Sequence, residues 1–183
     1  MLYSPEKTRE KLYGKPTLQY DSSSNQICRR QEEETSVMNI AVGCDHGGFE
    51  LKQAVIKFLA ENGYGYKDFG TYDTQSCDYP DIAVPVAKAV AAGEFDRGIL
   101  ICGTGIGIGI AANKVPGIRA ALCHDTFSAH ASREHNNANI LTMGQRVVGQ
   151  GLALDIVKIW LTTEFEGGRH QRRIDKIHEQ EVR

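Results

Sequence analysis

From residue 38 onward, short apolar runs alternate with longer segments whose apolar residues recur every three to four positions. Apolar runs of five or six residues bounded by turn residues are typical of strands buried on both faces, and the longer spacing is typical of helices. We therefore predict five strands, at 38–43, 64–69, 98–102, 118–123 and 139–143. Helices are predicted at 49–61, 82–92, from the glycine-rich run to 113, and at 127–135, 151–162 and 169–180.

The regular alternation of strand and helix predicts an α/β fold, in which a five-stranded parallel sheet is covered by helices on both faces. In such doubly wound sheets, ligands bind at the carboxyl ends of the strands. The residues that directly follow each predicted strand are therefore the first candidates for chemistry.

The first 37 residues differ from the rest of the chain. They are polar, rich in charge and serine, and lack hydrophobic periodicity. This composition predicts a disordered N-terminal extension ahead of a single folded domain at 38–183, which ends in a helical segment. The extension has no apolar segment of the kind found in signal peptides.

Charge and cysteine content narrow the class of protein. The formal net charge is -2, so nothing indicates the basic surface of a nucleic-acid-binding or membrane-surface protein. No apolar run approaches the ~20 residues that cross a bilayer. The five cysteines are an odd number without CxxC spacing, which is typical of reduced thiols and predicts a cytoplasmic protein. Cys44 with His46, and Cys123 with His124, leave a zinc site open as an alternative.

Asp45 and His46 follow the first predicted strand, where the chain turns into a helix. A carboxylate and an imidazole at this position suit proton transfer or anion binding. Alternatively, Asp45 only caps the N-terminus of the helix.

Cys102 ends the third predicted strand and precedes glycines at 103, 105, 107 and 109. Glycines leave backbone N–H groups unshielded at the start of the next helix, a geometry that stabilises an oxyanion or a phosphate. Because a helix N-terminus favours the anionic form of a nearby thiol, Cys102 is a candidate base or nucleophile. The alternative is a structural cysteine buried beside a turn.

The same glycine-rich run fits a permissive dinucleotide-binding fingerprint. Gly107, Gly109 and Ala112 have the G-x-G-x-x-A spacing, and Asp125 ends the next strand, where a ribose-binding acid is expected. However, these glycines begin five residues beyond the strand. A dinucleotide-binding oxidoreductase is therefore an alternative from another functional class.

Two later segments also carry candidates. His135 stands in a polar run before the last predicted strand. Arg169 and Arg173 are four residues apart, which places both guanidinium groups on one face of a helix. Such a pair suits a dianionic phosphate, and a solvated basic face is the alternative.

Taken together, eight segments resemble the type B ribose-5-phosphate isomerases. They are 43–49 (GCDHGGF), 78–80 (DYP), 99–108 (ILICGTGIGI), 111–114 (AANK), 117–120 (GIRA), 133–136 (REHN), 144–149 (GQRVVG) and 166–170 (EGGRH). The resemblance runs in order over about residues 38–180. It implies a Rossmann-like three-layer α/β/α sandwich, and a homodimer or homotetramer with active sites at subunit interfaces. It also implies that the enzyme uses neither a metal nor a nucleotide cofactor.

The resemblance further implies how the chain would interconvert ribose 5-phosphate and ribulose 5-phosphate, a step of the pentose phosphate pathway. Cys102 matches the base that moves a proton between C1 and C2. His135, with Asp45 as a helper, matches the group that opens the furanose ring. The cradle for the enediolate matches Thr104 and the N–H groups of Gly103, Gly105 and Gly107.

The residues that match substrate-binding positions of the family lie in several segments. His46, Arg169 and Arg173 match the phosphate clamp. Tyr79 and Asn136 are expected to contact the sugar, and Arg146 is expected to reach the site from the partner subunit.

The loop also bears on the substrate. One branch of the family replaces the cysteine with a glutamate later in the loop, where this chain has Ile108, so the chain resembles the cysteine branch. Galactose-6-phosphate isomerases divide the cysteine and histidine motifs between two subunits. This chain carries both motifs, which favours ribose 5-phosphate. Galactose 6-phosphate and allose 6-phosphate are alternative substrates, and a sugar-phosphate sensor without turnover is an alternative function.

Overall fold

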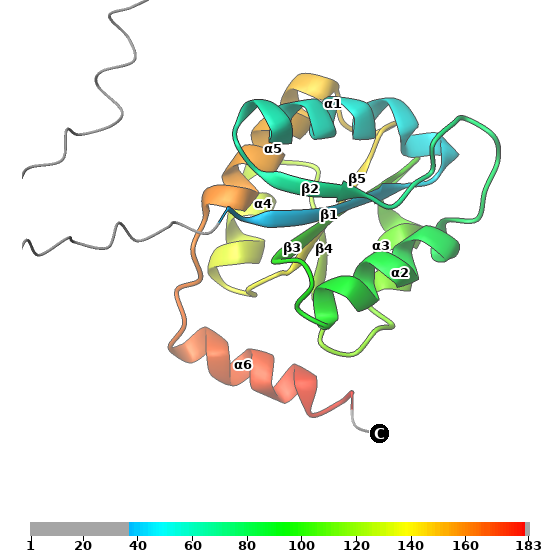
Figure 1. The fold of residues 1–183 in the computed structure, drawn as a ribbon. Helices are drawn as coiled ribbons and strands as arrows, with labels where there is room; N and C mark the ends of the chain where they lie inside the picture. The colour runs from blue at the N-terminus through cyan, green and yellow to red at the C-terminus, as the bar shows by residue number, and fades with distance from the viewer. Residues whose placement is uncertain (1–36, 182–183) are drawn as a thin grey trace, which may run out of the picture. The chain divides into compact units, whose positions relative to one another are not determined.

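Five strands form one parallel sheet (Figure 1). The computed structural model describes residues 37–181 of the chain. Within this range, the strands are β1 (Asn39–Cys44), β2 (Gly65–Asp68), β3 (Arg97–Cys102), β4 (Ala120–Leu122) and β5 (Ile140–Gly144). They lie in the order β2-β1-β3-β5-β4, and each neighbouring pair is parallel. The predicted five-stranded parallel sheet is confirmed.

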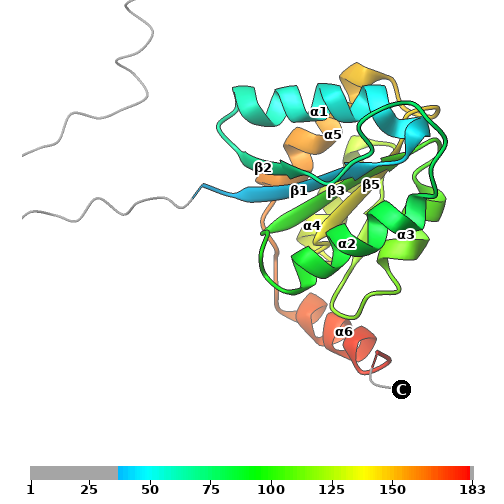
Figure 2. The same cartoon turned by 45° about the vertical axis from the view of Figure 1, so that its right-hand side comes forward.

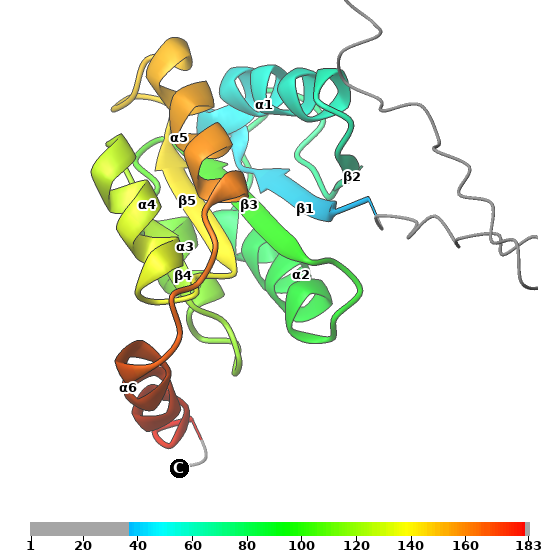
Figure 3. The ribbon, with the colours of Figure 1, turned by 90° about the vertical axis from the view of Figure 1, so that its left-hand side faces the viewer.

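Helices cover both faces of the sheet (Figure 2). They are α1 (Phe49–Glu61), α2 (Tyr79–Ala91), α3 (Ile106–Ala112), α4 (Thr126–Glu134), α5 (Gln150–Thr162) and α6 (Arg169–His178), and a short 3₁₀ turn, η2 (His46–Gly48), precedes α1. Helices α1, α4 and α5 share a core with one face, and α2 and α3 share a core with the other. This arrangement confirms the three-layer α/β/α sandwich. Helix α6 lies apart from both helical layers (Figure 3).

The sheet is buried on both faces because successive side chains of a strand point in opposite directions. In β1, Ile40 and Val42 pack in the core that includes α1 and α5, whereas Ala41 packs in the core that includes α2. All six residues of the central strand β3 are buried. A strand with two buried faces therefore carries a continuous apolar run instead of an alternating pattern.

Some predicted boundaries are wrong. Helix α2 begins at Tyr79, three residues before the predicted start, because Pro80 fits the first turn of a helix, where no backbone N–H is needed. The edge strands β2 and β4 contain four and three residues instead of six, and each pairs with only one neighbour. Apart from Val37, the predicted N-terminal extension at 1–37 lies outside the described residues.

A buried ion pair joins α1 to the end of β2. Lys52 is fully buried, and its Nζ lies 2.8 and 2.7 Å from the two carboxylate oxygens of Asp68. Nζ also donates to the C=O of Thr71. Oδ1 of Asp68 accepts a further hydrogen bond from the N–H of Gly70 at 2.9 Å. The pair thereby holds the chain segment that follows β2 against α1.

We expect Asp68→Ala to lower the free energy of unfolding by about 3 kcal/mol, because it leaves the Lys52 ammonium group buried without its counter-charge. Urea unfolding at neutral pH measures the loss. The matched control is Glu61→Ala, which removes the exposed pair of Lys57 and Glu61 on the same helix. That change should cost less than about 1 kcal/mol. Equal losses in the two variants would show that burial of Lys52 does not set the cost.

Candidate active site

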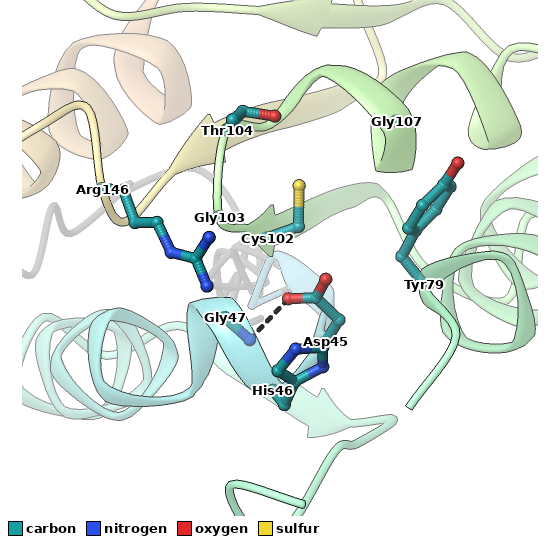
Figure 4. A pocket seen from close by; sticks show the side chains of 9 residues that line it. All are labelled: Asp45, His46, Gly47, Tyr79, Cys102, Gly103, Thr104, Gly107 and Arg146. Carbon is teal, nitrogen blue, oxygen red and sulfur yellow. Dashed lines mark hydrogen bonds between the residues drawn. The ribbon is translucent and has the colours of Figure 1, made fainter. Parts of the chain in front are cut away.

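A cavity of about 290 Å³ opens at the carboxyl ends of β1 and β3 (Figure 4). The winding direction reverses between these strands, because β2 lies on one side of β1 and β3 on the other. Doubly wound sheets bind their ligands at this kind of position. The cavity is lined by Asp45, His46, Gly47, Tyr79, Cys102, Gly103, Thr104, Gly107 and Arg146.

Cys102 is the last residue of β3, and 5% of its surface is exposed. Its Sγ accepts a hydrogen bond from the N–H of Gly105 at 3.0 Å. Gly105 has a φ of 77°, and a Cβ there would stand 2.7 Å from the carbonyl carbon of Met143, so only glycine fits. The glycine loop therefore places a backbone amide against the thiol.

The start of α3 forms one wall of the cavity. Oγ1 of Thr104 accepts a hydrogen bond from the N–H of Ile106 at 3.3 Å, just before the helix. The ring of Tyr79 packs so closely on the backbone of α3 that a Cβ on Gly107 would stand 2.8 Å from it. This wall combines backbone amides with two hydroxyl groups, which can hold the oxygen atoms of a polar ligand.

Asp45 and His46 line the cavity from the end of β1. Oδ1 of Asp45 accepts a hydrogen bond from the N–H of Gly47 at 2.8 Å, so Asp45 both caps η2 and faces the cavity. Nδ1 of His46 accepts a hydrogen bond from the N–H of Cys77 at 3.2 Å. In a neutral imidazole, this contact leaves the proton on Nε2, which is then available to donate to an anion.

Arg146 lies in the turn that follows β5. Its N–H donates to the C=O of Gly103 at 3.1 Å, and its guanidinium carbon lies 3.3 Å from the position of a Cβ on Gly103. Arg146 therefore lines the cavity of its own chain, and the expectation that it reaches the site from a partner subunit is wrong. The reason is sheet order: β5 is the direct neighbour of β3, so the turns after the two strands touch.

His135 does not line this cavity. It directly follows α4 and precedes β5, which places it at the amino ends of the strands, whereas Cys102 is at the carboxyl ends. The five residues of β5, at about 3.3 Å each, separate the two edges by roughly 16 Å. The expected partnership of Asp45 and His135 is therefore not formed within one chain.

The other residues expected to bind substrate lie near His135. Arg169 and Arg173 are exposed on α6. Asn136 lines a separate groove between β4 and the end of the chain. The fold thus divides the predicted site into two groups, one around Cys102 and one around His135.

Two further cysteines are poor candidates for chemistry. Burial raises the pKa of the Cys44 thiol to about 12 and that of the Cys123 thiol to about 11. Both thiols therefore stay neutral near pH 7. Within residues 37–181, neither residue belongs to a group of three side chains able to hold a metal ion, which argues against the zinc alternative.

The position of the glycines argues against the dinucleotide alternative. Gly107 and Gly109 lie inside α3, and a Cβ on Gly109 would stand 2.9 Å from Oγ1 of Thr142. These glycines allow a helix to pack closely and do not form the loop that holds a pyrophosphate. Asp125 caps α4 by accepting a hydrogen bond from the N–H of Ser128 at 2.7 Å.

Glu166 and His170 were not among the predicted site residues, and the structure places both beside His135. Oε2 of Glu166 lies 3.1 Å from Nε2 of His170 and 4.0 Å from Nε2 of His135. Glu166 lies in the segment before α6 and His170 in the first turn of that helix, so helical spacing gave no signal for this contact.

The fold and the cavity define a doubly wound α/β protein that combines a thiol, backbone amides and cationic side chains at the switch point of its sheet. The chain belongs to the ribose/galactose isomerase family, whose sequence model matches residues 40–177. None of the helices within residues 37–181 is long and apolar enough to cross a bilayer.

Known relatives cover most of the chain. Ribose-5-phosphate isomerase B of Escherichia coli is 54% identical over 138 residues, which span 75% of this chain and 93% of that protein. D-erythrulose-4-phosphate isomerase of Pectobacterium atrosepticum is 45% identical over 143 residues, 77% of this chain and 93% of that protein. The structure of ribose-5-phosphate isomerase B of Clostridium thermocellum superposes with a TM-score of 0.79 at 59% identity, covering 79% of this chain and 98% of that one.

Proposed function

We propose that this chain is an aldose–ketose isomerase that interconverts ribose 5-phosphate and ribulose 5-phosphate through an enediolate, with Cys102 as the base. The observation that carries the proposal is the position of the Cys102 thiol, which lines the cavity and accepts a hydrogen bond from the Gly105 amide. Family membership and the names of the relatives support the same class of reaction. In the cell, the reaction belongs to the pentose phosphate pathway of the cytoplasm.

In the proposed reaction, the Cys102 thiolate takes the proton from C2 of the open-chain aldose and returns it to C1 of the enediolate. One proton also moves from the hydroxyl on C2 to the oxygen on C1, so atoms and electrons balance without an external oxidant or reductant. Negative charge develops on the two enediolate oxygens. The amides of the loop from Gly103 to Gly107 and the hydroxyl of Thr104 stabilise this charge.

Ring opening requires a second acid–base group, and the cavity of one chain does not contain His135. We assign this role to His135 of the partner subunit in a homodimer. In the proposed dimer, the amino edge of one sheet faces the carboxyl edge of the other. The two-fold axis repeats this contact, so each dimer has two complete sites. Asp45, Tyr79 and Arg146 of the first subunit and Asn136 of the second then surround the sugar. Two such dimers can pair into a homotetramer without changing the sites.

The substrate phosphate is proposed to bind between His46 of one subunit and α6 of the other. Arg169 and Arg173 are one helical turn apart on α6, and both are exposed in a single chain. Neither guanidinium group forms an ion pair within residues 37–181, which suits a ligand that arrives from another subunit.

Replacement of Arg173 tests this clamp. We expect Arg173→Ala to raise KM for ribose 5-phosphate by about 10- to 100-fold with a smaller change in kcat, because a charge-assisted hydrogen bond contributes roughly 1.5–3 kcal/mol. The phosphate is remote from C1 and C2, so its contacts stabilise the bound substrate and the transition state alike. Arg172→Ala is the matched control, since Arg172 directly precedes Arg173 on the same helix but lies on another side of it. Unchanged KM in the Arg173 variant, or equal increases in both, would contradict the clamp.

The function itself is tested by following the conversion of ribose 5-phosphate to ribulose 5-phosphate with EDTA present. Turnover supports the isomerase, and binding without turnover would instead indicate a sugar-phosphate sensor. The physiological sugar is tested by comparing kcat/KM for ribose 5-phosphate, allose 6-phosphate and galactose 6-phosphate. Erythrulose 4-phosphate belongs in the same series, because one relative is named as its isomerase. We expect the highest kcat/KM with ribose 5-phosphate.

A further inference from the structure

Three side chains converge on one point beside the end of α4. Nε2 of His170 lies 3.1 Å from Oε2 of Glu166, and Nε2 of His135 lies 4.0 Å from the same oxygen. The ligating atoms of the three residues lie within 4.8 Å of one another. In the part of the chain that the structure describes, this is the only group of three side chains with such a geometry.

The backbone holds this cluster in place from three elements. His135 directly follows α4, Glu166 lies in the segment between α5 and α6, and His170 is in the first turn of α6. The N–H of Glu166 donates to the C=O of Glu134 at 3.0 Å, which ties the segment to the end of α4. The rings of His135 and His170 stack at a centroid distance of 4.4 Å and an interplanar angle of 10°. The three side chains therefore meet without any rearrangement of the backbone.

The electrostatic surroundings favour a cation. Oε2 of Glu134 lies 3.1 Å from Nε2 of His135, so a second carboxylate adjoins the cluster. The cluster also lies at the C-terminus of α4, where the helix dipole carries partial negative charge. The opposing group is Arg169, whose Nε lies 3.3 Å from Nε2 of His170. Its side chain is exposed and can turn away into solvent.

We propose that His135, Glu166 and His170 form a binding site for a divalent transition metal ion of the zinc class. Two imidazoles and a carboxylate are a common ligand set for Zn²⁺, while Mg²⁺ and Ca²⁺ prefer oxygen ligands alone. Donor atoms about 2.0–2.1 Å from a tetrahedral zinc ion are about 3.3 Å apart. The distance of 3.1 Å between Oε2 of Glu166 and Nε2 of His170 already matches this value. The distance of 4.0 Å between Oε2 of Glu166 and Nε2 of His135 has to shorten by less than 1 Å. The two rings tilt out of their stack so that both lone pairs point at the ion.

Occupation of this site inhibits the isomerase. The metal ion uses the lone pair of His135 that ring opening requires, so metal binding and catalysis on the cyclic sugar exclude each other. This consequence rests on the proposed function of His135, whereas metal binding itself does not. The two claims can therefore be tested separately.

Binding is tested on the full-length protein by titration with Co²⁺, followed by its visible absorption, and with Zn²⁺, followed by calorimetry. We expect one ion per chain, and we expect His170→Gln and Glu166→Gln each to weaken binding by at least about tenfold. His130→Gln is the matched control, since His130 is an exposed histidine of α4, five residues before His135 and outside the group of three. Glu166 is exposed, so its variant keeps the test valid if His170→Gln fails to fold.

A second control separates this site from the thiol. Cys102→Ser should bind Co²⁺ as tightly as the wild type, because the three ligands come from one chain and Cys102 is not among them. Loss of binding in this variant would overturn the proposal, as would unchanged binding in both the His170 and Glu166 variants.

Inhibition is then measured on ribose 5-phosphate. Zn²⁺ should lower kcat/KM in proportion to occupancy, EDTA should restore it, and Glu166→Gln should need at least about tenfold more Zn²⁺ for the same loss. Equal sensitivity of the wild type and this variant would refute inhibition through the site. If the proposed function fails, turnover is absent while Co²⁺ binding persists. If the metal site fails, turnover is present and binding is absent.

Discussion

Replacing Cys102 with alanine is expected to lower kcat for ribose 5-phosphate by about 10²–10⁴, the usual contribution of a general base. The thiol lies at the end of β3 against the Gly105 amide, and Cys102 is the cysteine that lines the cavity. Binding of the substrate should change little, since its phosphate and hydroxyl groups contact other residues. Steady-state kinetics and calorimetry on the same variant measure both quantities.

The matched control for this prediction is Cys77→Ala. Cys77 is also a free cysteine and is more exposed than Cys102, but it does not line the cavity, and its backbone N–H donates to His46. We expect kcat of this variant within about twofold of the wild type, as for a change outside the reacting groups. A wild-type kcat in the Cys102 variant would remove Cys102 from the mechanism. Equal losses of kcat in both variants would show that the loss is not specific to Cys102.

Mixing two inactive variants is expected to restore activity. If each site combines Cys102 of one subunit with His135 of the other, a hybrid dimer of Cys102→Ala and His135→Ala chains contains one intact site. After equimolar co-refolding, half of the dimers are hybrids, and each hybrid has one intact site of two. The activity should therefore recover to about a quarter of the wild-type activity. Recovery from an almost inactive mixture is a large and specific effect. The measurement is the rate of ribulose 5-phosphate formation before and after subunit exchange.

The control for this experiment combines two variants of the same cavity. Cys102 and Arg146 line one cavity from one chain, so hybrids of Cys102→Ala and Arg146→Ala contain no intact site. Their mixture should stay at the mean activity of the two parent variants. If the mixture with His135→Ala behaves in the same way, the shared-site dimer is wrong, although Cys102 can still be the base.

Residue spacing within short segments was sufficient to predict the elements around the site. The buried run that forms β3 ends at Cys102, and glycines at 103, 105 and 107 mark the loop that follows. The edge of the sheet at which His135 lies was not predicted, although it follows from the parallel topology. A residue between a helix and the next parallel strand lies at the amino edge of the sheet, away from Cys102.

Contacts between distant segments were harder to predict. Lysine is rarely fully buried, yet Lys52 is, because Asp68 and the C=O of Thr71 surround its ammonium group. Glu166 and His135 meet because the segment after α5 returns to the end of α4. In both cases the partners are set by packing between elements, which local periodicity does not encode.

The sequence by itself determined the strand–helix alternation, the two apolar faces of the sheet and the position of Cys102 before a glycine loop, because these features depend on neighbouring residues. Only the tertiary structure decided the strand order, which places β5 beside β3 and so brings Arg146 to the cavity of its own chain. It also decided that His135, Glu166 and His170 form a separate cluster. The physical reason is that strand order and helix packing are set by the burial of whole surfaces, which joins residues far apart in the chain.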